Sequence, residues 1–465
     1  MWRKAETSSS ILDMKPEDID SAEKRGSYTV CVVSCGRIGL LQACLFAEAG
    51  FKVVCADTNQ ALVNSLARGK APFLKHQIEP ILRKCVKSGF FKATNDIKMA
   101  VSQSNVAVIA TQTKVDENGK VNYSDIESTC KLIGSGLHKD ILVVVISIVG
   151  HGITEELIKE VLERVSGLKV GADFYLAYSP VQVLEDETLD KMVSHPRIVA
   201  GVGKSSLDAA STILETITKK GVAKAGDVRT AEATTLFRAM ERVTKLGLAN
   251  EVAMLCEKAG IDYLKVQKLA GASNGNQFVS PTLDGGENSA ELQMMFEEAE
   301  SLNTKLRIAT IAKEVNEESL RHAINLIHGA LKASGRPLRS AKIAFLGISK
   351  TSNATDMGKD SVKALAKMLE KKAVKLRFYD PYASDNEQIE FEYPLKKSLT
   401  EAVEGANCIA ILVNHEQFAR LNLKKLKAMV KMPAAIVDFV GVLEPEKLEM
   451  EGFIYRGLGR GVWKK

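Results

Sequence analysis

Short runs of apolar and β-branched residues alternate with stretches of helical periodicity from residue 28 onward. In the first half of the chain the predicted elements are the strand Tyr28 to Val33, the helix Leu40 to Ala49, the strand Lys52 to Ala56, the helix Asn59 to Ala67, and the strands Val106 to Thr111, Ile141 to Ile148, Phe174 to Ala177 and Arg197 to Gly201. Nearly continuous apolar strands are typical of a parallel sheet covered by helices on both faces. Residues 28–226 are therefore predicted to form a doubly wound α/β domain.

The pattern changes between about Asp227 and Ala333, where the strand signals disappear. Apolar residues recur at intervals of three and four from Ala231 to Lys258, which predicts one helix about 42 Å long at ~1.5 Å per residue. We interpret 227–334 as a central helical segment that serves as a spacer, a dimerisation surface or both. Its predicted dimer face is Leu236-Phe237, Met240, Val243-Thr244, Gly247-Leu248, Val252 and Leu255-Cys256.

Strands and helices alternate again from Ala341. The predicted elements are the strand Ile343 to Leu346, the helix Ser361 to Lys371, and the strands Lys375 to Tyr379, Ile409 to Val413 and Ala435 to Asp438. Residues 335–465 are predicted to form a second, smaller doubly wound domain. The fold class is thus α/β, with two Rossmann-like domains joined by a long central helix, and 1–27 are expected to be a loose N-terminal tail.

Composition and charge narrow the classes of function. Of the 465 residues, 63 are basic and 57 acidic, and these charges are interleaved, which disfavours nucleic acid as the main partner. No apolar run reaches the ~20 residues that span a bilayer, and no signal peptide is expected. Eight scattered cysteines favour a reduced, cytoplasmic compartment. Cys31 and Cys35 have no second pair at ligand spacing, so no metal site is predicted.

A glycine-rich turn lies between the first predicted strand and helix and reads Ser34-Cys35-Gly36-Arg37-Ile38-Gly39. It matches the dinucleotide-binding pattern GxGxxG except that Ser34 replaces the first glycine, so that Ser34→Gly is expected to tighten binding or leave it unchanged. Asp57 lies 21 residues after Gly36, close to the ~20 expected for the acid that binds the adenosine ribose. Its charge favours NAD over NADP. The predicted cofactor-binding residues are Ser34, Gly36, Arg37, Ile38, Gly39 and Asp57. The alternative is a turn retained only to pack its helix.

Many further short segments follow in a regular order. They are Ala67 to Pro72, Tyr178-Ser179-Pro180, His195 to Val199, Ala231-Glu232, Leu248 to Glu251, Gly260-Ile261-Asp262, Tyr379 to Tyr382, Gly405-Ala406-Asn407, His415 to Phe418, Gly452-Phe453 and Gly457-Leu458-Gly459. With these segments the chain resembles the UDP-glucose and GDP-mannose dehydrogenase family, particularly the branch acting on UDP-N-acetylhexosamines, from about Tyr28 to the C-terminus.

This resemblance implies an NAD-binding N-terminal domain, a homodimer through the central helix and a C-terminal domain that helps to bind a UDP-sugar. It adds Thr113 and Glu185 to the predicted cofactor-binding residues, with Glu185 beside the nicotinamide. Family members oxidise the sugar C6 alcohol to a carboxylate in two hydride transfers, through a thiohemiacetal and a thioester on a cysteine. A lysine and an asparagine stabilise the oxyanion, and a glutamate or water relays protons.

Nearly every reactive position of the family is substituted here. The nucleophilic cysteine falls on Asn288, and no cysteine lies between Cys256 and Cys408. The remaining substitutions place Thr235 at the lysine, Ala239 at the asparagine, Val181 at the glutamate, Ser147-Ile148-Val149-Gly150 at a Ser-Thr-Val-Pro segment, and Val440 and Gly441 at an arginine and an asparagine. Lys350 is a candidate match to a family lysine, but Thr351 and Ser352 break the motif that follows. His76, His151, His195 and His415 share no spacing typical of a triad or a metal site.

Three hypotheses follow from these substitutions. The first is a divergent, NAD-linked nucleotide-sugar 6-dehydrogenase with weak activity or none. The second is a non-catalytic protein that binds NAD or a nucleotide sugar, or a regulatory subunit in a hetero-oligomer with an active relative. The third is a two-electron NAD-dependent oxidoreductase on another substrate, for which Glu185 is the only candidate base. We favour a degenerate site on the family scaffold.

Overall fold

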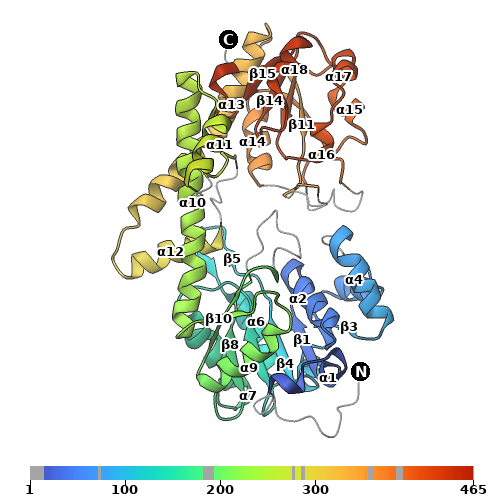
Figure 1. The fold of residues 1–465 in the computed structure, drawn as a ribbon, viewed down its shortest axis with the longest axis vertical. Helices are drawn as coiled ribbons and strands as arrows, with labels where there is room; N and C mark the ends of the chain where they lie inside the picture. The colour runs from blue at the N-terminus through green and yellow to red at the C-terminus, as the bar shows by residue number, and fades with distance from the viewer. Residues whose placement is uncertain are drawn as a thin grey trace. The chain divides into compact units, whose positions relative to one another are not determined.

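The computed structural model describes residues 15–71, 75–181, 193–274, 278–283, 289–350, 352–353, 360–383 and 391–463. The chain divides into two compact units (Figure 1). They are Met1–Ala239 with Asn288–Thr304, and Met240–Glu287 with Lys305–Lys465, here called the N-terminal and C-terminal units. The predicted central segment 227–334 is divided between these two units.

An eight-stranded sheet forms the N-terminal unit, in the order β10-β9-β8-β7-β4-β1-β2-β3. Its strands are β1 (Thr29–Val33), β2 (Lys52–Ala56), β3 (Phe91–Thr94), β4 (Val106–Ile109), β7 (Leu142–Val145), β8 (Tyr175–Tyr178), β9 (Arg197–Gly201) and β10 (Val222–Lys224). Neighbouring strands are parallel except β8 and β9, which are antiparallel. From β1 the chain extends the sheet through β2 and β3 on one side, and β4 begins the other side. The carboxyl ends of β1 and β4 therefore form the topological switch point.

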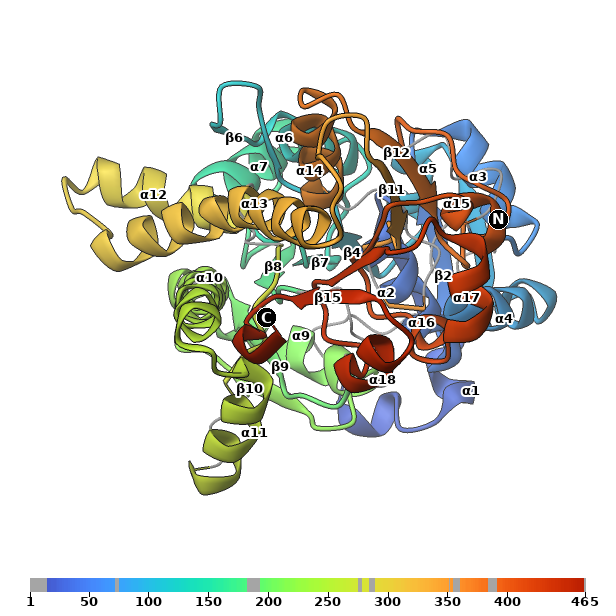
Figure 2. The ribbon, with the colours of Figure 1, turned by 90° about the horizontal axis from the view of Figure 1, so that it is seen from above.

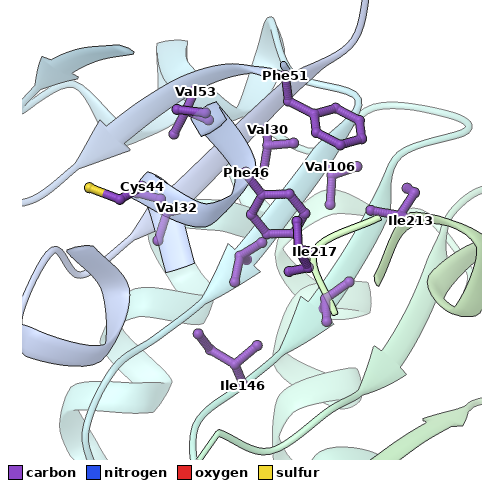
Figure 3. Close-up of a cluster of buried hydrophobic side chains, with 14 of the residues drawn as sticks. Val30, Val32, Cys44, Phe46, Phe51, Val53, Val106, Ile146, Ile213 and Ile217 are labelled. Carbon is purple, nitrogen blue, oxygen red and sulfur yellow. The ribbon is translucent and has the colours of Figure 1, made fainter. Parts of the chain in front are cut away.

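Helices cover both faces of this sheet. They are α2 (Arg37–Glu48), α3 (Gln60–Ala67), α4 (Lys75–Lys87), α5 (Ile97–Ser102), α6 (Ser124–Gly134), a π-helical segment (Thr154–Lys159) that continues into α7 (Glu160–Ser166), and α9 (Lys204–Glu215). Side chains alternate along β1, so that Val30 and Val32 face the core formed with α2 and α9 while Cys31 and Val33 face the core formed with α5, α6 and α7. Figure 3 shows the first core, in which Phe46 and Phe51 pack edge to face with ring centroids 5.7 Å apart.

The rest of the N-terminal unit surrounds the carboxyl edge of the sheet. A small antiparallel hairpin joins β5 (Lys114–Val115) to β6 (Val121–Asn122). Helix α12 (Ala290–Ser301) contacts both hairpin strands, and the Val121 N–H donates to a Glu297 oxygen at 2.9 Å. The first part of α10 (Val228–Ala259) also belongs to this unit.

The C-terminal unit contains a fully parallel five-stranded sheet, in the order β12-β11-β13-β14-β15. Its elements are α11 (Tyr263–Asn274), α13 (Arg307–Ala333), β11 (Lys342–Leu346), α14 (Asp360–Glu370), β12 (Lys375–Tyr379), α15 (Leu399–Val403), β13 (Cys408–Ile411), α16 (Glu416–Ala419), α17 (Leu423–Met429), β14 (Ala435–Asp438), α18 (Pro445–Met450) and β15 (Ile454–Gly457). Helix α13 lies beside α14 (Figure 2) and also packs on β14 and β15. Two doubly wound α/β sheets confirm the predicted fold class.

Several boundaries differ from the predictions. The segment 15–27, predicted as loose tail, instead contains α1 (Ala22–Arg25), and Ile19 is buried in the N-terminal core. Arg25 fixes this segment by donating from Nη1 to the Ile19 carbonyl at 2.6 Å and from Nε to the Ala49 carbonyl. The predicted helix from Ala231 is four residues longer as α10, which has 32 residues. Strand β4 ends at Ile109, two residues before the predicted end at Thr111.

Two general findings concern the chemistry of the chain. All eight cysteines are buried free thiols. Within the described residues, no helix has both the length and the apolar composition needed to cross a membrane.

Candidate functional site

In the turn from β1 into α2, the backbone requires glycine at some positions of the glycine-rich pattern but not at others. Ser34 adopts φ +73°, the left-handed region that favours glycine. A Cβ atom on Gly39 would lie 2.0 Å from the Ser34 carbonyl oxygen, so the third glycine is required for α2 to approach the turn. Gly36 is different: its φ of −62° suits any residue, and a Cβ atom there would meet no atom of the described residues within 4 Å. Nothing in the described protein explains a glycine at 36, which is consistent with space kept for a ligand.

The N-terminus of α2 is available to an anion. Gly36 precedes the first helical residue, Arg37, and no side chain caps this end of the helix. By contrast, Asn59 caps α3 and Asp96 caps α5. The first amides of a helix lack partners within the helix and carry the positive end of its dipole, which suits a phosphate group.

Asp57 directly follows β2, and its carboxylate forms a hydrogen bond with the glycine turn. One carboxylate oxygen accepts from the Cys35 N–H at 2.7 Å and the other from the Asn59 N–H at 2.9 Å. The side chain is half-buried, and each oxygen retains a lone pair for a further donor. The carboxylate is therefore placed beside the turn and can still accept from ribose hydroxyls.

A cavity of about 670 Å³ lies at the carboxyl edge of the sheet in the N-terminal unit. Thr113, one of its walls, donates from its hydroxyl to the Ile148 carbonyl at 2.6 Å. The cavity is lined by the glycine turn, the ends of β4 and β7, the hairpin and the start of α12. The lining residues are Ile38, Ala110, Thr111, Gln112, Thr113, Lys114, Val115, Asp116, Glu117, Gly119, Ile146, Ser147, Ile148, Ser289, Ala290, Glu291 and Met294. The turn residue Ile38 and the predicted residue Thr113 thus share one cavity.

A buried carboxylate and two phenols, which sequence reasoning did not single out as reactive groups, lie near the ends of β7 and β8. The oxygens of Glu232 accept from the N–H groups of Gly152 and Thr154 at 2.6 and 2.9 Å, and burial raises the pKa of this carboxyl above its ordinary value. The Tyr123 hydroxyl accepts from the Gly150 N–H at 3.0 Å, and burial raises the pKa of Tyr123 to about 12. Burial also raises the pKa of Tyr178 far above its ordinary value. These phenols stay protonated at neutral pH.

Two residues that the resemblance predicts to replace family catalytic residues lie on the buried face of α10. Thr235 and Ala239 are 3% and 0% exposed. At Gly150, which the resemblance predicts to lie at the family proline, a Cβ atom would lie 2.6 Å from the Tyr123 hydroxyl oxygen. A side chain at position 150 would therefore clash with a tyrosine 27 residues earlier in the sequence. Sequence reasoning pointed to this region through the segments Ser147 to Gly150 and Ala231-Glu232, but it did not identify Tyr123.

Arg197 is a cation without an acidic partner among the described residues. It donates from Nε to the Ser179 hydroxyl at 2.8 Å and from Nη1 to the Gln42 side-chain oxygen at 2.5 Å. Burial lowers the pKa of this guanidinium to about 9. The contacts connect α2 with the segment that leaves β8 at Ser179, Pro180 and Val181.

The structure does not describe all of the remaining predicted residues. Glu185 and Asn288 lie outside the described residues, as do Thr351 and the side chain of His76. His151 pairs with Glu298 at 3.3 Å on the surface of the N-terminal unit. In the described parts of the chain no three His, Cys, Asp or Glu side chains are grouped so that they could hold a metal ion.

The C-terminal unit has its own polar cluster at the ends of β11, β12 and β13. The Asn353 N–H donates to His415 Nδ1 at 2.8 Å, so the ring proton is on Nε2, which lies 3.1 Å from an oxygen of Asp380 and 3.2 Å from the Ser349 hydroxyl. Lys350 is exposed. Val440 and Gly441 follow β14, where their N–H groups donate to Asp438.

Three models of one family match the chain in succession. They are the NAD binding domain of the UDP-glucose/GDP-mannose dehydrogenase family over residues 28–220, its central domain over 229–318 and its UDP binding domain over 344–445. The first match indicates NAD as the cofactor, and the last supports a nucleotide sugar as a ligand.

Individual relatives agree with these matches. The chain is 27% identical over 450 residues to a UDP-N-acetyl-D-mannosamine dehydrogenase of Methanococcus maripaludis, covering 95% of this chain and 100% of the relative. It is 25% identical over 445 residues to a UDP-glucose 6-dehydrogenase of Rhizobium meliloti, covering 93% and 99%. A solved UDP-D-ManNAc dehydrogenase structure from Pyrococcus horikoshii has the same fold, with a TM-score of 0.83, 24% identity and coverage of 93% and 100%.

Proposed function

Because the chain belongs to the UDP-glucose/GDP-mannose dehydrogenase family, we propose that it binds NAD in the N-terminal unit and a UDP-sugar in the C-terminal unit, with little or no oxidation of the sugar. The observation that carries the cofactor assignment is Gly36, whose missing side chain leaves open space that no atom of the described residues occupies. The amides at the start of α2 would hold the pyrophosphate, and Asp57 would accept from the adenosine ribose.

The cavity beside the turn is proposed to receive the nicotinamide half. Its walls include Ile38 from the turn and Thr113 and Ile148 from the ends of neighbouring strands. Bound NAD would supply the hydride acceptor. The protein groups that line the cavity would orient the ring.

The substitutions on α10 support a degenerate site. A covalent oxidation needs a thiolate and a cation near the oxyanion, and loss of one oxyanion donor alone costs about a hundredfold to a thousandfold in rate. Thr235 and Ala239 provide neither charge nor a thiol. Among the described cavity residues the one ammonium group, Lys114, is paired with Asp125 at 2.7 Å. Glu232 is engaged by two backbone amides, so it is not free to act as a base.

The experiment combines binding with turnover. Isothermal titration with NAD, NADP, UDP-glucose and UDP-N-acetylhexosamines is expected to show binding of NAD and at least one UDP-sugar. Absorbance of reduced nicotinamide is expected to stay flat, with no uronate formed. Two NAD molecules reduced per sugar would contradict the degenerate site. One NAD reduced per sugar, lost in Glu185→Gln, would instead support the two-electron alternative.

A further inference from the structure

A chain of three hydroxyl groups crosses the carboxyl ends of β1 and β4. The Ser34 and Thr111 hydroxyl oxygens lie 2.7 Å apart, and Thr111 lies 2.9 Å from the Thr129 hydroxyl on α6. Val33 and Ile109 are paired neighbours in the two strands, so Ser34 and Thr111 follow directly after the switch point of the sheet. In open α/β sheets this crevice is where a ligand lies across the strand ends.

The hydrogen bonds in this chain have a direction. Thr111 donates its proton to Thr129, and Ser34 therefore donates its proton to Thr111. Both protons point away from the crevice, and the Ser34 oxygen is left with lone pairs only. A phosphate oxygen at this point would meet an acceptor rather than a donor.

The backbone of Ser34 offers a ligand no donor either. Its N–H donates to the Ala56 carbonyl at 3.0 Å, and its carbonyl oxygen lies against Gly39. A serine at φ +73° costs about 1 kcal/mol or more relative to glycine. The hydrogen bond to Thr111 offsets part of this strain and holds the side chain in place.

We propose that the Ser34–Thr111–Thr129 hydroxyl chain is a ligand-selecting element that disfavours a pyrophosphate at the turn and leaves the adenosine half of the site unaffected. The inference rests on the proposed NAD site and adds its selectivity: the wild-type protein discriminates less between NAD and adenosine than a protein with glycine at position 34. Asp57 is on the β2 side of the turn, so contacts with the adenosine ribose do not depend on the hydroxyl chain.

The test measures the affinities of NAD, ADP-ribose and adenosine by isothermal titration for three variants of the full chain. Ser34→Gly removes the acceptor at a backbone conformation that glycine adopts without strain. Thr129→Val lets Thr111 turn its proton toward Ser34, which frees the Ser34 proton for a phosphate without any change in the crevice. Both variants are expected to bind NAD and ADP-ribose about threefold to tenfold more tightly, with adenosine changed less than twofold. Ser34→Ala, which keeps the Cβ atom, is expected to gain less than Ser34→Gly.

Several results would overturn the inference. They are weaker NAD binding in Ser34→Gly, an equal gain for adenosine, or unchanged NAD affinity in Thr129→Val, which a purely steric role of Ser34 predicts. Failure of the NAD site itself gives a different result, because Asp57→Ala would then leave the affinities of all three ligands unchanged.

Discussion

At the scale of single residues, Gly36 and Gly39 of the same turn have opposite surroundings. Gly39→Ala places a methyl group on the Ser34 carbonyl oxygen and is expected to lower the free energy of unfolding by about 1–3 kcal/mol. Gly36→Ala meets only open space and is expected to change stability by less than about 1 kcal/mol. It should nevertheless weaken NAD binding roughly tenfold, since the methyl group occupies the approach of the pyrophosphate.

Urea unfolding and titration calorimetry on both variants measure these effects. A loss of stability in Gly36→Ala as large as in Gly39→Ala would show that both glycines serve packing alone. That outcome would favour the interpretation of the turn as a structural remnant.

Asp57 determines the choice of cofactor in this proposal. Asp57→Ala is expected to weaken the binding of NAD. It should also reduce the preference in affinity for NAD over NADP, because the repulsion between the carboxylate and a 2′-phosphate is removed. The variant also releases the Cys35 and Asn59 amides, so the melting temperature must be recorded with the affinities. Asp57→Asn is the control, since it keeps the size of the side chain. Equal affinity of the wild-type protein for NAD and NADP would contradict the assignment.

At the scale of elements, two strand-end aspartates of the C-terminal unit respond to pH in opposite directions. Burial alone would raise the pKa of Asp380, but the hydrogen bond from His415 and the backbone donors Ile348 and Tyr382 outweigh it, and the pKa lies below its ordinary value of 3.8. Asp380 therefore contributes stability above pH 3.8, and this contribution is lost as the pH falls through the folded-state pKa. Asp380→Asn is expected to lower the free energy of unfolding at pH 7 and to weaken its decline in acid.

Asp438, after β14, supplies the matched control. Burial raises the pKa of this carboxyl although the N–H groups of Leu443 and Val440 donate to it. Its contribution to stability is complete below pH 3.8 and is lost as the pH rises through the folded-state pKa. The measurement is urea unfolding followed by circular dichroism from about pH 3 to about pH 7. Over this range the free energy of unfolding should rise more with pH in Asp438→Asn than in the wild-type protein. A parallel response of the two variants would contradict the opposite pKa shifts of the two carboxyls.

At the scale of the whole molecule, the homodimer stays a prediction, and the structure changes which residues would carry it. Leu236 and Val243 of the predicted face are 1% and 0% exposed, and Gly247 packs against Ala312 of the same chain rather than being open to a partner helix. Leu248 and Leu255 remain 55% and 63% exposed on α10. On α13, Ile308 and Ile311 are 71% and 59% exposed. We propose that these four exposed residues contact a second copy.

Light scattering tests this proposal. The wild-type protein should have about twice the chain mass of 50.6 kDa, and Leu255→Glu with Ile311→Glu should return it to one chain. Met450→Glu, on α18, is the control, because Met450 is 78% exposed and lies outside the proposed contact. A wild-type monomer at micromolar concentration would contradict the homodimer and leave the hetero-oligomer with an active relative as the alternative.

The sequence by itself determined the architecture. Strands such as Lys52–Ala56 and Ala435–Asp438 were predicted with the bounds that the structure has, and Lys375–Tyr379 also matches. Hydrophobic periodicity depends on neighbours within a few residues, so it can be recognised locally. The glycine turn and Asp57 were also singled out from sequence alone, and the structure places both at the carboxyl ends of β1 and β2.

Only the tertiary structure decided what several of these residues contact. The Ser34 hydroxyl is hydrogen-bonded to Thr111, 77 positions later in the sequence. The Gly150 N–H donates to the hydroxyl of Tyr123, 27 positions earlier. Gly247 serves an internal contact with α13 rather than an external one. Such contacts form between residues that are brought together by chain folding and leave no periodic pattern in the sequence. The exposed part of α10 likewise depends on which face α13 covers, and no property of the isolated helix specifies that choice.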